Sequence, residues 1–165
     1  MGYLENKTFD EIKVCDGAVL SKTLTRQDIE LFAIMSGDVN PEHLDKEYAK
    51  RSMFHEIIAH GMWGGSLIST VLGTKLPGPG TIYLNQTLKF LKPVTIGDTI
   101  RIKVKVTNKK EKHNIVTLDC TCTNQDGNDV ITGESVVIAP KEKLKLKKMI
   151  LPQIKLQEDK KNSLC

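Results

Sequence analysis

Aromatic residues are scarce in this chain of 165 residues, at 5% of the sequence. The interior must therefore be built mainly from Ile, Leu, Val and Met, which suit the wall of an apolar channel as well as a packed core. With 39% hydrophobic and 27% charged residues, the composition is otherwise that of an ordinary globular protein. The length suits one domain.

Long apolar runs are also missing. The first twenty residues alternate charged and apolar positions and lack the apolar stretch of a signal peptide. No later stretch reaches the length of a membrane span. We therefore expect a cytoplasmic protein with no membrane partner.

Cysteines are few, and the four that occur are too scattered for a disulfide framework. Cys120 and Cys122 are two residues apart in a predicted strand, so both side chains should point to one face. This pattern favours reduced, partly buried thiols over a metal or redox pair. The four histidines lack ligand spacing with one another and with the cysteines, so we predict no metal site and no cofactor.

The net charge of +4 comes from the C-terminal end of the chain. Residues 141–165 carry eight lysines against three acidic residues, which leaves the body through Pro140 with a charge of −1. The body therefore lacks the basic patch of a nucleic-acid-binding fold. We expect residues 1–140 to form the domain and residues 141–165 to form a basic tail or linker.

Helical signals occupy the first half of the sequence, after a predicted strand over roughly residues 12–20. Thr25, followed by Asp28 three residues later, predicts a capped helix that runs to Met35 and ends at Ser36-Gly37. A short helix is expected from Asp45 to about Lys50. Residues 61–73 contain no charge, and a helix that is apolar on every side must be enclosed by protein.

Strand signals fill the second half, after the turn residues 77–80. Apolar and polar residues alternate over 100–107, and residues 115–123 repeat this pattern. Asp126-Gly127 predicts a hairpin turn into a last strand over 130–139. The fold class is therefore α+β, and a single antiparallel sheet wrapped around the apolar helix, the hot-dog fold, buries both economically.

Polar side chains gather in one short segment between the first two predicted helices. Asp38, Asn40 and His43 lie within six residues, and an aspartate with a histidine supplies a base and an acid that work near neutral pH. Pro41 keeps Asn40 out of helical geometry, so we expect all three side chains on an irregular loop. The sequence thus predicts an acid–base pair here.

A second candidate feature is Gly61, at the start of the apolar helix. Free N–H groups and the positive end of the helix dipole occur at such a position and would stabilise an oxyanion. A glycine that simply admits the helix close to the sheet is the alternative explanation.

These elements resemble the MaoC-like (R)-specific enoyl-CoA hydratases. The resemblance rests on Ser36–Asp45, His60–Met62, Leu76–Leu84, Pro93-Val94 and Gly97-Asp98, and it covers roughly Phe9 to Ala139. Its most specific part is the Asp-x-Asn-Pro-x-His element. The chain is most similar to the hydratase domain found fused ahead of a phosphate acetyl/butyryltransferase, which suggests an acyltransferase partner.

The resemblance implies a homodimer that adds water to a trans-2-enoyl-CoA thioester to give the (3R)-hydroxyacyl-CoA. Asp38 and His43 would hold the attacking water and exchange protons, while the Gly61 N–H would polarise the thioester oxygen. Four further residues would organise the loop, approach the substrate or close the acyl tunnel: Asn40, Ser69, Met62 and Leu72. Glu42 replaces the aliphatic residue common at its motif position, but its side chain could point to solvent.

Two other functions remain open from the sequence. A thioesterase on the same fold would direct water to the thioester carbonyl instead of C3. A non-catalytic acyl-CoA-binding module would deliver substrate to an acyltransferase and would bind without turnover.

Overall fold

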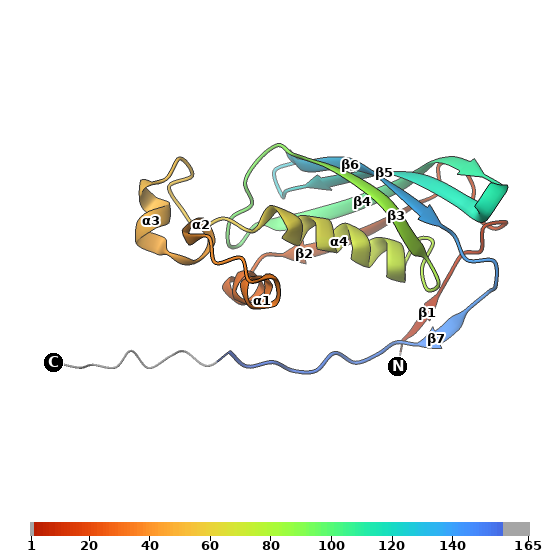
Figure 1. The fold of residues 1–165 in the computed structure, drawn as a ribbon, viewed down its shortest axis with the longest axis horizontal. Coiled ribbons are helices and arrows are strands. Elements are labelled where there is room, and N and C mark those ends of the chain that lie inside the picture. The colour runs from red at the N-terminus through yellow and green to blue at the C-terminus, as the bar shows by residue number, and fades with distance from the viewer. Residues whose placement is uncertain (1, 157–165) are drawn as a thin grey trace.

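A five-stranded antiparallel sheet wraps around one long helix in the computed structural model, which describes residues 2–156. The strand order is β2-β4-β5-β6-β3, and Figure 1 shows the sheet lying over α4. The elements are β2 Gly17–Thr23, β3 Ile82–Phe90, β4 Thr99–Lys110, β5 Ile115–Thr123, β6 Asp129–Ile138 and α4 Gly61–Thr74. A turn of 3-10 helix, Lys112–Asn114, joins β4 to β5. The predicted α+β hot-dog fold is confirmed.

The core lies between the inner face of the sheet and one side of α4. Its largest buried side chains include Ile100, Ile102, Val104 and Val106 of β4, which alternate with exposed polar residues as the sequence predicted. Burying each such side chain contributes roughly 1.5–3 kcal/mol to stability. Strand and helix therefore hold each other in place, and the N-terminus of α4 is fixed against the ends of the strands.

Cys120 and Cys122 lie side by side on the inner face of β5, and both are buried free thiols. Burial raises the pKa of the Cys122 thiol to about 12, so it stays protonated at neutral pH. Cys165 lies outside the described residues.

The first half of the chain supplies the helices around the site. The helix α1, Arg26–Ser36, has the predicted capping box between Thr25 and Asp28, and Gly37 ends it in the left-handed conformation at φ 75°. The helix α3, Lys46–Arg51, begins after Asp45, whose carboxylate accepts from two backbone N–H groups. Both ends of α1 were therefore readable from local capping chemistry, and Asp45 caps the start of α3.

The expected start of one strand and the expected burial of one helix differ from the structure. The strand expected over residues 12–20 begins only at Gly17, because the chain turns before it: Cys15 has φ 76° and Asp16 N–H donates to the Lys13 carbonyl. The full enclosure expected for α4 is also wrong for the single chain. The sheet covers one side of α4, whereas Met62, Ser66 and Ser69 are exposed on the other.

The C-terminal residues run back to the N-terminus. The strand β7, Lys145–Lys147, pairs with β1, Tyr3–Glu5, and the buried Asn6 bonds the carbonyls of Pro79 and Glu142. Beyond β7 the chain is extended and mostly exposed, and it passes below α1 in Figure 1. The described residues contain no helix that is long and apolar enough to span a membrane.

Candidate active site

In residues 38–43, two side chains each accept a hydrogen bond from a backbone N–H two residues further on. The segment ends in one helical turn, α2, Pro41–Leu44. Asp38 Oδ1 accepts from the Asn40 N–H at 3.1 Å, and Asn40 Oδ1 accepts from the Glu42 N–H at 3.3 Å. The expected irregular loop is present for Asp38 and Asn40. It is wrong for His43, because Pro41 occupies the first helical position, where a proline favours helix formation.

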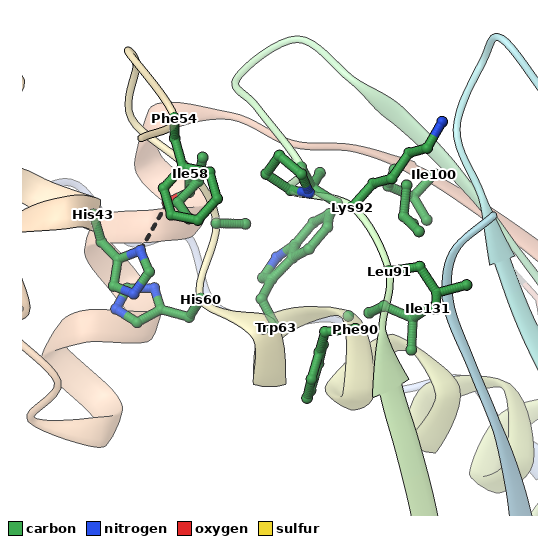
Figure 2. Close-up of a pocket in the computed structure, with 16 residues that line it drawn as sticks. His43, Phe54, Ile58, His60, Trp63, Phe90, Leu91, Lys92, Ile100 and Ile131 are labelled. Carbon is green, nitrogen blue, oxygen red and sulfur yellow. Dashed lines mark hydrogen bonds between the residues drawn. The ribbon is translucent and has the colours of Figure 1, made fainter. Parts of the chain in front are cut away.

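His43 is buried, with 8% of its surface exposed, and one ring nitrogen is fixed by the backbone. Its Nδ1 lies 2.9 Å from the Ile58 carbonyl oxygen (Figure 2). A carbonyl only accepts, so Nδ1 carries the hydrogen. In the neutral ring Nε2 then holds the lone pair, and no described residue bonds it. His43 therefore presents an acid–base nitrogen in a fixed orientation.

His60 is a site residue to which the sequence assigned no role. It is 3% exposed, and its Nε2 donates to the Asp38 carbonyl at 3.0 Å. Its ring lies against His43, with centroids 3.9 Å apart and an interplanar angle of 34°, and it also contacts the ring of Phe32. Sequence spacing could not show this, because His60 and Asp38 are 22 residues apart.

The carboxylate of Asp38 and the two imidazoles form one cluster, in which a ligand atom of each lies within 4.8 Å of the others. A metal ion could take ligands from these three residues. The two rings are tilted by 34°, and one nitrogen of each already bonds a backbone carbonyl. The same three groups can also exchange protons with one another or with a bound water molecule.

Gly61 begins α4, so its N–H has no acceptor within the helix and points out from the positive helix end. A Cβ at this position would lie 2.9 Å from the ring of Phe90. The glycine thus also leaves room for close packing, as the alternative explanation proposed. The group that packs there is a side chain of the edge strand β3. The two explanations are compatible.

An apolar cavity of about 270 Å³ opens beside His43, His60 and Gly61. Figure 2 shows Phe54, Trp63, Phe90 and Ile131 around it. Lys92 is the one lysine or arginine among the described residues that line the cavity. Its Nζ is held 2.8 Å from Asn128 Oδ1. A small apolar group could enter such a space beside the two histidines.

The predicted site residues fall into two groups. Asp38, Asn40, His43 and Gly61 lie together at the N-terminus of α4, and Met62 follows at 56% exposure. His43 and Gly61 are among the residues that line the cavity, whereas Asp38, Asn40, Met62, Ser69 and Leu72 are not. Ser69 lies on the exposed side of α4 and Leu72 lies in the core. Their expected roles near the substrate stay predictions.

Glu42 does not point wholly to solvent, as the sequence suggested. Its Oε2 is buried and has no hydrogen-bond partner among the described residues. The side chain turns inward because Glu42 lies on the α2 turn, whose backbone bonds the Ile58 segment.

Comparison with known proteins gives the family. A family model described as MaoC like domain matches residues 13–126. An (R)-specific enoyl-CoA hydratase from Rhodospirillum rubrum is 48% identical over 132 residues, which cover 80% of this chain and 91% of the relative. A hydratase of the same name from Aeromonas caviae is 42% identical, with 78% of this chain and 96% of the relative covered. The structure of an unliganded R-hydratase from Pseudomonas aeruginosa superposes with a TM-score of 0.90 at 42% identity, over 94% of this chain and 100% of that one. The protein therefore belongs to the MaoC-like domain family.

Proposed function

We propose that this protein is a hydratase that adds water to a trans-2-enoyl-CoA thioester and releases the (3R)-hydroxyacyl-CoA. The observation that carries the proposal is the position of His43: its ring is fixed at an apolar cavity beside the N-terminus of α4, and the Asp38 carboxylate lies in one cluster with that ring. The names of the related (R)-specific hydratases support the substrate class and the stereochemistry.

The reaction follows from these groups. The Gly61 N–H and the helix dipole polarise the thioester oxygen, which makes C3 electrophilic. Water attacks C3 as one of its protons passes to the Asp38–His43 pair, and the electrons of the double bond move to the thioester oxygen as an enolate. The enolate then collapses while C2 receives a proton from the pair. One C–O bond and one C–H bond form, while the π bond of the C=C group and one O–H bond of water break. All atoms of the water molecule end in the product.

Crotonyl-CoA tests the proposal directly. The protein should bleach the enoyl absorbance without releasing a free thiol, and a dehydrogenase specific for the (3R)-hydroxyacyl-CoA should oxidise the product. Release of CoA thiol with the conjugation intact would identify a thioesterase instead. Binding of crotonyl-CoA with neither change would identify a binding module.

We further propose that the protein is a homodimer. Large apolar side chains are exposed at the end of α1, on the loop after it, on the free side of α4 and on the edge strand β3: Ile34, Met35, Val39, Met62, Ile82, Leu84 and Phe90. Apolar surface concentrated on a few adjoining elements favours association, and an edge strand can pair with another.

Sedimentation measures the mass of the assembly. The parent protein should sediment as a dimer at micromolar concentration. Leu84→Lys, on the edge strand β3, should shift it toward monomer. Lys103→Glu, on β4 near the other edge of the sheet, should not. A monomeric parent contradicts the proposal. An acyltransferase partner and a cytoplasmic location stay predictions from the sequence.

A further inference from the structure

We propose that His60 is a positioning residue that holds the Asp38 loop and the His43 ring in their working geometry. The inference rests on the proposed function, since it concerns the same acid–base pair. His60 is the residue that precedes Gly61, so it belongs to the segment from which α4 and its free N–H groups start. One imidazole thus contacts three parts of the site.

The Asp38 loop depends on His60 because its other bonds are local. Residues 36–41 are all exposed. Asp38 N–H donates to Ser36 Oγ at 3.2 Å, and Asn40 N–H donates to Asp38 Oδ1 at 3.1 Å. The bond from His60 Nε2 to the Asp38 carbonyl is the one hydrogen bond, within the described part of the chain, that ties residues 37–40 to a segment far away in sequence. Without it residues 37–40 would be bonded only to their neighbours in sequence, at the end of α1 and in α2.

The His43 ring is held by the same neighbour. The bond from Nδ1 to the Ile58 carbonyl fixes one edge of the ring, and the tilted His60 ring packs against it with centroids 3.9 Å apart. The edge bond alone leaves the ring free to tilt about that bond. Contact with the His60 ring restricts this tilt, so Nε2 keeps its direction.

Packing alone does not explain why this residue is a histidine. His60 Nδ1 is buried and has no hydrogen-bond partner among the described residues. A phenylalanine would fill the same space and contact Phe32 and His43 without burying an unpaired nitrogen. What a phenylalanine lacks is the Nε2–H donor to the Asp38 carbonyl, so the structure assigns the histidine to that bond.

Two substitutions separate the hydrogen bond from the packing. His60→Phe keeps a ring in the stack and removes the donor, whereas His60→Gln places an amide N–H near the position of Nε2 and removes the ring. We expect His60→Phe to lower kcat for crotonyl-CoA about 10- to 100-fold with KM changed little, because the loop would lose its placement and not its substrate contacts. His60→Gln should recover at least part of that loss.

Stability and amide exchange complete the test. The melting temperature of His60→Phe should stay near that of the parent, and backbone amides of residues 37–40 and 42 should exchange faster, with slower exchange again in His60→Gln. The exchange measurement does not require turnover, so it tests the positioning role even if the parent fails to hydrate crotonyl-CoA. Parental kcat and parental exchange in His60→Phe would overturn the proposal. Equally accelerated exchange in both variants would also overturn it, because the donor would then make no difference to the loop.

Discussion

An Asp38→Asn variant is expected to hydrate crotonyl-CoA about 10²- to 10⁴-fold more slowly than the parent, with the fold intact. The amide has the volume of the carboxylate and keeps an oxygen that can accept from the Asn40 N–H, the bond that measures 3.1 Å in the parent. The loop should therefore keep its shape. What the variant loses is the negative charge and the basic oxygen, so kcat should fall while the melting temperature stays near that of the parent.

Asp45→Asn is the matched control for this experiment. Asp45 lies in the same segment and caps α3 by accepting from the N–H groups of Glu47 and Tyr48. Asparagine caps helices as well as aspartate does. This control removes the same charge from a nearby position and should hydrate crotonyl-CoA at the parent rate. If Asp38→Asn is no slower than Asp45→Asn, the carboxylate at position 38 has no part in the reaction.

The fold was largely predictable because its signals are local. The Thr25–Asp28 capping box, the left-handed Gly37 and the alternation of apolar residues along β4 each act within a few residues, so the sequence alone exposes them. The exposed side of α4 could not be foreseen in the same way. An uncharged helix must be covered, but its sequence does not tell whether its own sheet or another chain covers it.

The site residues also divide into those that the local sequence reveals and those that only the folded chain brings together. Asp38 and His43 were predictable because they are neighbours in sequence on a segment with more polar groups than a turn requires. The contribution of His60 arises from a hydrogen bond and a ring contact that only the folded chain creates. The cavity likewise takes its walls from the segment before α4, from α4 itself and from the ends of β3 and β6. No spacing rule brings those residues together.

Replacing His43 should produce a loss as large as that at Asp38, and two substitutions show which ring nitrogen matters. His43→Asn places an amide N–H near Nδ1, so it can keep the bond to the Ile58 carbonyl while it removes Nε2. His43→Gln places an amide near Nε2, but an amide does not exchange protons near neutral pH as an imidazole does. Both variants should lose about 10²- to 10⁴-fold in kcat. Parental turnover by His43→Asn would mean that Nε2 takes no part.

The double variant Asp38→Asn with His43→Asn tests whether the two groups act as one unit. Each single substitution leaves the other group in place, since His43 is bonded to Ile58 and the Asp38 loop is bonded to His60. If both groups serve the same water molecule, removing one already disables the pair, and the double variant should be about as slow as the slower single variant. If the groups serve independent steps, the two losses in kcat should multiply. Kinetics of the four proteins with crotonyl-CoA distinguish these outcomes, and we expect the first because the ligand atoms of the two side chains lie within 4.8 Å.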